Sequence, residues 1–345
     1  MARIRRANGS VGIKDVAQKA GVSIGTVSNV VNRPHVVAAG TRNRVQAAIE
    51  ELGYVRDESA RQLRAGSSRA LGLLVLDLGN PFFVDVARGA EQAAHDAGLN
   101  MITCNSGQRV DREVSYLAML AELRVRGVLV SPVGTAADSL ALFRRGAIPY
   151  VLVDRRSPDG TSCSVSVDDV AGGALAARHL VETGHRNIAF VNGPAVLVQC
   201  REREQGFCSE IGDADLSILE VEALTVESGR DAGSRILGIS PRPTAVFCAN
   251  DLLALGVLQT MVGAGVRVPE DISIVGYDDI EFASAAAVPL TSVRQPAARI
   301  GQKAAELLIE ETSGAGAHRH QTVVYTPELV VRASTRVSRG ARASK

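Results

Sequence analysis

The sequence predicts an all-α helix-turn-helix domain followed by a two-lobed α/β domain with parallel sheets and a hinged cleft. Two short helices with helix-turn-helix spacing lie between residues 13 and 32, and apolar strands alternate with helices from residue 71 onward. The chain has 345 residues. This length allows a head of about 60 residues and two further domains of ordinary size.

The helix-turn-helix prediction rests on two amphipathic helices joined at a glycine. Apolar residues of the first helix recur at the i, i+3, i+4 and i+7 positions of one face, namely Ile13, Val16, Ala17 and Ala20. Gly21 can end this helix, and Ser23 can cap the next one. The buried stripe of the second helix would consist of Val27, Val30 and Val31.

The other faces of the second helix carry short and mostly polar side chains, which let its backbone approach base edges in a DNA major groove. The candidate DNA contacts on this helix and its cap are Ser23, Ile24, Gly25, Thr26, Ser28, Asn29 and Asn32. An ordinary helical hairpin has the same spacing, so the pattern favours DNA binding without requiring it.

A third helix and a linker follow. Thr41 can cap the third helix, whose apolar face consists of Val45, Ala48, Ile49 and Leu52 and which ends at Gly53 and Tyr54. Residues 57–69 are predicted as a linker helix that is too short to be stable alone and folds on binding. Arg61 and Arg64 could contact phosphates, and Leu63 could wedge between base steps in the minor groove. The alternative is a solvated tether.

Positive charge is concentrated at the N-terminal end of the chain. Residues 1–70 contain 12 Lys or Arg and 5 Asp or Glu, and the remainder contains 26 and 32, so the net charges are +7 and −6. Such a concentration of positive charge is typical of proteins that bind DNA phosphates, and the affinity for DNA should fall steeply with salt concentration. The basic ends, residues 1–10 and 336–345, are predicted to be disordered tails. The head would then span residues 11–56, and the two-lobed domain residues 70–335.

The two-lobed domain is predicted from two cycles of strands and helices. Continuous apolar strands indicate parallel sheets that are covered on both faces. The first cycle has the strands LGLLVLDL, NMITC, GVLVSP and PYVLVD, and the second, from Asp168, has NIAFVNG, TAVFCAN and ISIVGY. TSVRQP and TVVYTPELVVRAS should add crossing and closing strands, so that the two lobes share several connections.

Polar and aromatic residues follow the predicted strands, where ligands of doubly wound sheets bind. The candidate effector contacts are Asn80, Phe82, Phe83, Asp154, Arg203, Asn250 and Asp278. Carboxylate, amide and guanidinium groups can bind vicinal hydroxyls, and an aromatic ring can cover sugar C–H groups. Each residue also has a structural alternative: Asn250 can simply cap a helix, and one phenylalanine can belong to the core.

Other function classes find little support in the sequence. The first strand is followed by LGNPFFVDVARG, which lacks a GxGxxG fingerprint, and no GxxxxGK[ST] motif occurs, so we expect neither an enzyme nor a bound cofactor. The five cysteines form no CxxC pair and have no metal-like spacing, so they are predicted to be reduced core thiols, and no metal site is expected. His179 and His185 are predicted to be structural because they share no helical face. With no apolar run of membrane-spanning length and no signal-peptide pattern, the protein should be cytoplasmic.

The segments IKDVAQKAGVS, TVSNVVN and ELGYVRDESARQL resemble the DNA-binding head of the LacI/GalR family, and the resemblance continues through the whole chain. It implies a repressor that binds a near-palindromic operator as a homodimer, with Leu63 of each subunit prying the central step apart. Ile24, Gly25 and Asn29 match the family's base-contacting positions. The commoner family pattern has larger residues at the positions of Ile24 and Gly25 and an arginine at the position of Asn29. Asn29 would favour adenine, whereas arginine favours guanine.

The resemblance also implies an effector domain similar to periplasmic sugar-binding proteins. Asp154, Arg203, Asn250 and Asp278 match positions of polar ligand contacts, and Phe82 and Phe83 match the position beside the ligand. Leu224 stands where several relatives have an aromatic ring. A sugar is therefore the favoured effector, with a purine or another metabolite as further candidates, and a ligand-independent architectural DNA-binding protein is the alternative function.

Overall fold

The computed structural model describes residues 11–54, 68–134, 140–146, 148–314 and 318–337. The chain divides into two units, residues 1–67 and 68–345. Residues 57–67 of the predicted linker helix, with Arg61, Leu63 and Arg64, lie outside the described residues, as do residues 1–10 and 338–345 of the predicted tails. The last two residues of the predicted helix, Ser68 and Arg69, are described and are not helical.

The N-terminal unit consists of three helices and a short 3-10 turn. Helices α1 (Ile13–Ala20) and α2 (Ile24–Asn32) are followed by η1 (Pro34–Val36) and α3 (Ala39–Leu52). Its core consists of Val16, Ala17, Ala20, Val27, Val30, Val45 and Ala48. Gly21 and Gly53 adopt the left-handed conformation, with φ of 64° and 60°, and end α1 and α3 as the sequence predicts.

The predicted cap of α3 is wrong. This helix begins at Ala39, and the backbone nitrogen of Arg42 already donates to the carbonyl of Ala38 at 3.0 Å. Thr41 therefore lies inside the first turn. Ala38 is the N-cap and has no side-chain oxygen, so a side-chain cap does not mark the start of this helix.

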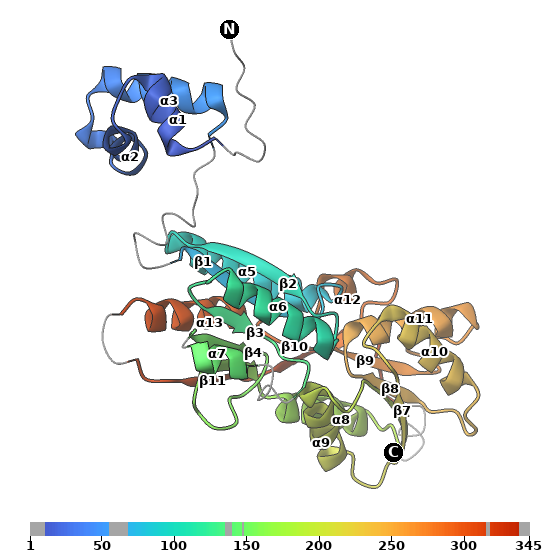
Figure 1. The fold of residues 1–345 in the computed structure, drawn as a ribbon. Coiled ribbons are helices and arrows are strands. Elements are labelled where there is room, and N and C mark those ends of the chain that lie inside the picture. Colours follow the sequence, from blue (N-terminus) through green and yellow to red (C-terminus); the bar gives the residue numbers. More distant parts are fainter. Residues whose placement is uncertain (1–10, 55–67, 135–139, 147, 315–317, 338–345) are drawn as a thin grey trace. The chain divides into compact units, whose positions relative to one another are not determined.

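The C-terminal unit contains two lobes, each with a six-stranded sheet among the described residues (Figure 1). The first sheet has the order β11-β5-β4-β3-β1-β2, formed by Thr322–Tyr325, Cys163–Val167, Tyr150–Val153, Val128–Val130, Ala70–Val75 and Asn100–Asn105. The second has the order β12-β10-β9-β8-β6-β7, formed by Glu328–Val330, Thr291–Arg294, Ser273–Asp278, Ala245–Cys248, Asn187–Asn192 and Asp215–Glu220. All neighbouring strands are parallel except β10 and β12.

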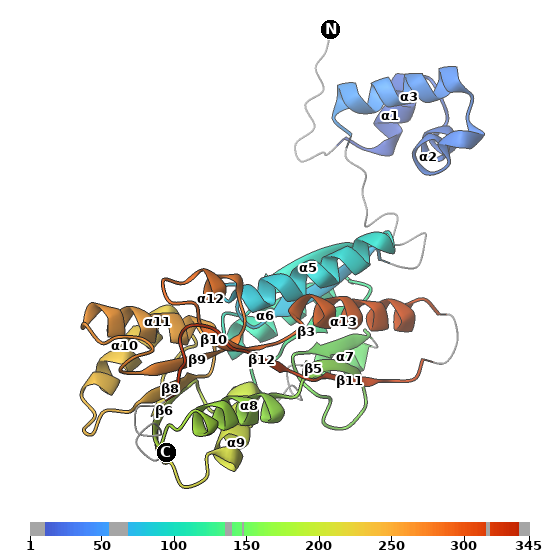
Figure 2. The same ribbon diagram turned by 180° about the vertical axis from the view of Figure 1, so that it is seen from behind.

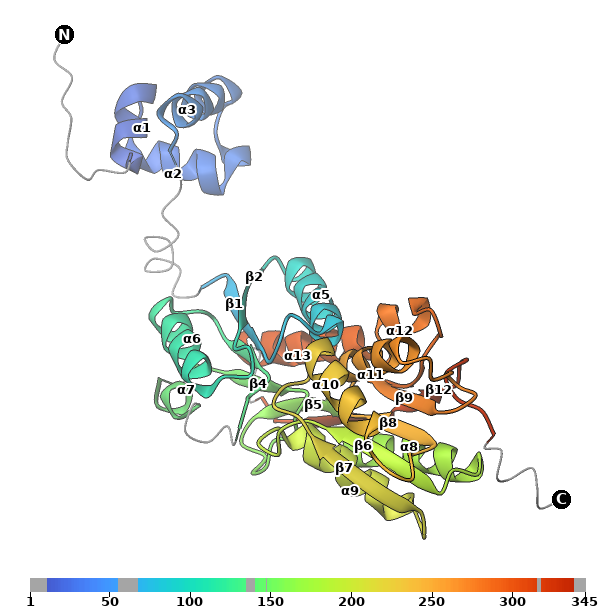
Figure 3. The ribbon, with the colours of Figure 1, turned by 90° about the vertical axis from the view of Figure 1, so that its right-hand side faces the viewer.

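Helices cover the sheets of both lobes. Those of the first lobe are α5 (Pro81–Asp96), α6 (Val110–Glu122), α7 (Ala141–Gly146) and α13 (Ala297–Thr312), and Figure 2 shows α5 and α13 side by side. Those of the second lobe are α8 (Asp169–Glu182), α9 (Val198–Glu210), α10 (Val226–Leu237), α11 (Asp251–Gly263) and α12 (Glu281–Ala285). Helices α10 and α11 pack against each other (Figure 3).

The chain passes between the lobes three times within the described residues, after β5, after β10 and between β11 and β12. The prediction that the late segments add strands to both lobes is therefore confirmed, because β11 pairs with β5 and β12 pairs with β10. Several crossings leave the lobes linked but able to change their angle. None of the helices in the described ranges is long and apolar enough to cross a membrane.

Candidate ligand site and DNA-contact helix

One small cavity collects every effector contact that the sequence predicts. Its lining contains Asn80, Phe82, Phe83, Asp154, Arg203, Asn250 and Asp278, together with Leu76, Leu197, Gln199 and Leu224. These residues come from both lobes and lie at or near the carboxyl ends of strands β1, β4, β6, β8 and β9. The cavity has a volume of about 20 Å³.

Two of the predicted polar residues also cap helices. Asn80 precedes Pro81 at the start of α5, and its side-chain oxygen accepts from the backbone nitrogen of Phe82 at 3.1 Å. Asn250 caps α11 by accepting from the backbone nitrogen of Leu253 at 2.9 Å. Both residues thus have the capping role that the sequence offers as an alternative. Each also lies in the cavity wall, because its helix starts after the end of a strand.

Two hydrogen-bonded residue pairs join the lobes across this cavity. The amide nitrogen of Asn80 donates to Oδ2 of Asp278 at 2.8 Å, and Nε2 of Gln199 donates to Oδ2 of Asp154 at 2.7 Å. Gln199 lies on α9 and is a contact that sequence reasoning missed, because it sits inside a helix and not directly after a strand. These pairs hold the lobes together through groups that a polar ligand could also use.

Arg203 is fixed by a buried polar network. Its Nε donates to Oδ1 of Asp169 at 2.7 Å, and its Nη1 donates to the carbonyl of Ala249 at 2.6 Å. The guanidinium carbon lies 3.7 Å from the centre of the Tyr277 ring. Asp169 was also missed by the sequence analysis. A guanidinium has five N–H donors in fixed directions, so the held group can present further donors to a ligand.

The backbones of α8 and α9 touch, and this contact places Asp169 beside Arg203. A Cβ atom at Gly173 would lie 2.1 Å from the carbonyl oxygen of Arg203, and one at Gly206 would lie 1.8 Å from that of Val170. Only glycine fits at either position, since a side chain at that distance would push the helices apart. The ion pair is thus built into the helix packing.

The two cavity carboxylates have unusual backbone conformations. Asp154 has φ of 57° and Asp278 has φ of 103°, both in the left-handed region that non-glycine residues rarely adopt. Such conformations cost of order 1–3 kcal/mol each and cluster at ligand sites, where surrounding structure enforces them. The strain supports a functional role for both strand ends.

Burial also changes the protonation of these carboxylates. Burial, with the nearby charge of Asp169, raises the pKa of Asp154 to about 8, although Arg203 acts in the opposite direction. Burial raises the pKa of Asp278 to about 6, against the stabilising effect of Arg203 and of the amides of Asn80 and Gln295. Oδ1 of Asp154 is buried and has no hydrogen-bond partner among the described residues. This oxygen is available to a ligand hydroxyl.

Apolar groups cover part of the cavity. Phe82 and Phe83 are both buried, with their rings 5.0 Å apart in an edge-to-face arrangement. Leu224, in the segment before α10, lines the cavity as its place in the sequence suggested. Leu76 and Leu197 add to the apolar surface. Phe82 and Phe83 are therefore the aromatic residues of the cavity lining, beside polar side chains and three leucines.

The DNA-contact candidates fall into two groups on α2. Ile24, Gly25 and Asn29 are exposed, and Thr26 and Ser28 are half-buried. Oγ of Ser23 instead accepts from the backbone nitrogen of Thr26 at 3.1 Å, and the amide nitrogen of Asn32 donates to the carbonyl of Ser28 at 2.8 Å. Ser23 and Asn32 thus stabilise the helix, and the exposed residues Ile24, Gly25 and Asn29 remain available to a base edge.

The predicted structural role of the two histidines agrees with their contacts. His179 shares a hydrogen bond of 2.9 Å with Thr335, and His185 shares one of 2.9 Å with Thr244. Burial lowers the pKa of both imidazoles. Both residues belong to the second lobe and lie away from the cavity lining.

Comparisons with known proteins match both units of the chain. Residues 12–57 match the model of bacterial regulatory proteins of the lacI family, and residues 177–335 match that of the periplasmic binding protein-like domain. An HTH-type transcriptional repressor PurR of Aliivibrio fischeri is 40% identical over 331 residues, covering 93% of this chain and 97% of the relative. The chain belongs to the LacI family.

Solved structures of LacI-family proteins agree with this assignment. A LacI-family regulator from Enterococcus faecalis with bound ribose is 32% identical, has a TM-score of 0.72 and covers 78% of this chain and 100% of its own. The Lac repressor dimer bound to operator and an anti-inducer is 28% identical, has a TM-score of 0.80 and covers 95% of this chain and 100% of its own. The LacI-family chain is therefore a DNA-binding transcriptional repressor with a two-lobed effector domain, and the predicted resemblance and fold class are confirmed.

Proposed function

We propose that this LacI-family repressor binds a near-palindromic operator as a homodimer and that a small polyhydroxylated effector in the cavity between its lobes controls operator affinity. A sugar is the effector class we favour. The observation that carries the proposal is the convergence of Asp154, Asp278, Arg203 and the capping amides of both lobes on one cavity. The target is DNA, so we expect the protein in the cytoplasm.

The chemistry of the cavity suits vicinal hydroxyl groups. Because the pKa of Asp154 is raised to about 8, its carboxyl group is protonated at neutral pH, and Oδ2 already accepts from Gln199. The partnerless Oδ1 can therefore donate that proton to one ligand hydroxyl, and Arg203 can donate to the neighbouring hydroxyl. Phe82 and Phe83 provide an aromatic surface for C–H groups. The Enterococcus faecalis relative with bound ribose supports the same class.

Ligand uptake should require the lobes to separate. A volume of about 20 Å³ holds little more than one water molecule, whereas small-molecule sites commonly measure about 300–1,000 Å³. Opening breaks the Asn80–Asp278 and Gln199–Asp154 hydrogen bonds, and the effector then takes their place. The ligand thereby favours one angle between the lobes over another, which is the differential affinity that allosteric control needs.

On the DNA side, α2 enters the major groove and Asn29 contacts adenine through its amide group. The positive charge of residues 1–70 supplies the phosphate contacts. Arg61, Arg64 and Leu63 complete the interface in the linker. The Lac repressor relative, which is a dimer bound to operator, supports the homodimer. A coupling of about 1–3 kcal/mol would change operator affinity roughly 5- to 150-fold.

The experiment is selection of genomic fragments by the purified chain, repeated with a panel of sugars and purines in the buffer. We expect a near-palindromic site whose recovery changes with one sugar. A response to a purine alone would replace the sugar by the purine-type effector that the PurR relatives suggest. Enrichment of no sequence, with steep salt dependence and no ligand effect, would support a ligand-independent architectural protein and overturn the proposal.

A further inference from the structure

The first lobe contains a second group of chemically reactive side chains, well separated in the fold from the effector cavity. Cys163, Glu311, His318 and His320 each offer one donor atom, and these four atoms lie within 4.8 Å of one another. Cys163 begins β5, Glu311 lies near the end of α13, and the two histidines precede β11. The group therefore sits at the amino ends of β5 and β11, whereas the effector cavity lies at the carboxyl ends of strands.

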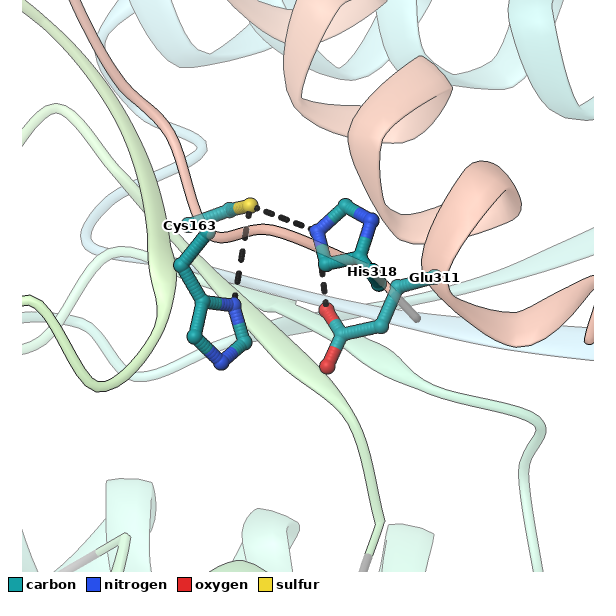
Figure 4. A group of neighbouring side chains, drawn as sticks. Cys163, Glu311 and His318 are labelled. Atoms are coloured by element: carbon teal, nitrogen blue, oxygen red, sulfur yellow. Dashed lines mark hydrogen bonds and ion pairs between the residues drawn. The ribbon is translucent and has the colours of Figure 1, made fainter. Parts of the chain in front are cut away.

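The donor atoms converge, and Figure 4 shows the sulfur of Cys163 and the carboxylate of Glu311 turned toward the ring of His318. Sγ of Cys163 lies 3.1 Å from Nε2 of His318 and 3.9 Å from Nδ1 of His320. Oε2 of Glu311 lies 4.0 Å from the same Nε2 of His318. The two rings meet edge to face with their centres 5.5 Å apart.

These separations suit a tetrahedral ion. Zinc ligands lie about 2.0–2.3 Å from the metal, so neighbouring ligand atoms of a tetrahedron are roughly 3.3–3.8 Å apart. Three of the separations are 3.1, 3.9 and 4.0 Å, and all lie within 4.8 Å, so the side chains would have to draw in by up to about 1 Å around an ion. Thiolate, imidazole and carboxylate together are a donor set that zinc accepts.

The carboxylate provides an independent observation. Oε2 of Glu311 is buried and has no hydrogen-bond partner among the described residues. A buried acceptor without a partner destabilises the folded state, and metal coordination would remove that cost. The backbone nitrogen of Gln321 donates to Sγ of Cys163 at 3.3 Å, the kind of supporting contact that orients a metal ligand.

An ion can reach the cluster from solvent. His320 is exposed, and together with Glu311 it lines a cavity of about 350 Å³ whose other walls include Tyr150 and Ser162. The four ligands would tie the end of α13 to the adjoining strands, joining residues 155 positions apart in the sequence. A metal ion that binds only the folded lobe stabilises it by an amount that grows with the logarithm of the free metal concentration above Kd.

We propose that Cys163, Glu311, His318 and His320 form a zinc site at the amino edge of the first lobe. This site is separate from the effector cavity, and its test does not depend on the proposed function.

The test is titration of the reduced, metal-free full chain with Zn²⁺ against a chromophoric chelator, followed by the same titration with Co²⁺. We expect one Zn²⁺ per chain and a visible tetrahedral cobalt spectrum with a thiolate charge-transfer band. Cys163→Ser and His318→Ala should weaken zinc binding at least ten-fold, because even supporting residues of metal sites commonly contribute 10- to 100-fold. Cys163→Ser should also abolish the thiolate band.

Matched controls are Cys208→Ser and His95→Ala, since both residues are exposed and lie outside the cluster. Both should bind zinc like the unsubstituted chain. Circular dichroism checks that each variant folds, and His320→Ala on the exposed side replaces any variant that does not. Binding of less than one Zn²⁺ per chain, equal binding by Cys163→Ser, or a cobalt spectrum without the thiolate band would overturn the proposal.

Discussion

Asn80 and Asp278 are 198 residues apart in the sequence, yet the side-chain nitrogen of one donates to the carboxylate of the other at 2.8 Å. Asn80 caps a helix of the first lobe, and Asp278 ends a strand of the second. Both line the effector cavity. The contact is therefore a measure of whether the lobes are closed, and a ligand that competes for either side chain acts directly on lobe closure.

Asn80→Asp should weaken effector binding by roughly 10- to 100-fold. The new carboxylate keeps the helix cap, because aspartate caps as well as asparagine. It replaces the amide donor that Asn80 offers to a ligand by a carboxylate, and it sets that carboxylate against Asp278, which opposes closure of the lobes over the effector. A hydrogen bond left unmade at a buried group costs about 1–3 kcal/mol. Isothermal titration calorimetry with the selected effector measures the loss. Asn187→Asp, at the opposite end of a strand in the second lobe, is the control and should bind normally.

Arg203→Met should destabilise the chain by about 3–5 kcal/mol. The substitution leaves Asp169 buried without its cation, and an uncompensated buried charge is the main cost of breaking such a pair. Adding Asp169→Asn should recover part of the loss, and urea denaturation measures both. The exposed pair Arg178 and Glu210 is the matched control, and Arg178→Ala should cost less than about 1 kcal/mol. Equal losses at the two arginines would contradict the buried network.

Asp154→Asn should change how stability depends on pH. Burial raises the pKa of Asp154 to about 8, so the folded chain retains a proton that the unfolded chain releases near pH 4. The contribution of Asp154 to the free energy of unfolding is therefore fully present below about pH 4, and it is lost as the pH rises toward 8. The variant lacks this loss, so its free energy of unfolding should rise relative to the unsubstituted chain by up to about 1.4 kcal/mol per pH unit in that window. If urea denaturation gives the same pH dependence of the free energy of unfolding for both proteins between pH 5 and pH 8, the raised pKa of Asp154 is contradicted.

Asn29→Ala should weaken operator binding and relax the preference at a single base position. The side chain is exposed on α2, and a bidentate contact to adenine is worth about 1–3 kcal/mol of discrimination. Fluorescence anisotropy with the selected operator and its single-base variants measures both effects. Asn43→Ala on the exposed face of α3 is the control. A uniform loss across all sequences would instead assign Asn29 to backbone contacts.

The sequence predicts much of the fold because apolar periodicity and strand-end chemistry are local. Strand β5 is missed, since its buried run CSVSV contains Ser164 and Ser166, which resemble loop residues although they lie inside the sheet. Strand β7 is missed because it lies at a sheet edge and has a single buried residue, Leu219. Hydrophobic patterning cannot detect either case.

The missed site residues depend on contacts between distant segments. Gln199 and Asp169 lie on helices. The packing of one lobe on the other brings Gln199 to Asp154, and the packing of α8 on α9 brings Asp169 to Arg203. The proposed zinc ligands also come from distant segments, because Cys163 lies 155 residues before His318 and no short motif joins them. A spacing rule for metal sites therefore fails where the sheet itself creates the proximity.

The most direct test of effector control is to measure effector affinity with and without saturating operator. Linkage requires that the effector change operator affinity by the same factor as the operator changes effector affinity. We expect equal factors between roughly 5 and 150 for the full chain, and we expect both to be lost in Asn80→Asp. Identical effector affinities for free and operator-bound protein would contradict it, because a ligand that does not distinguish the two states cannot regulate DNA binding.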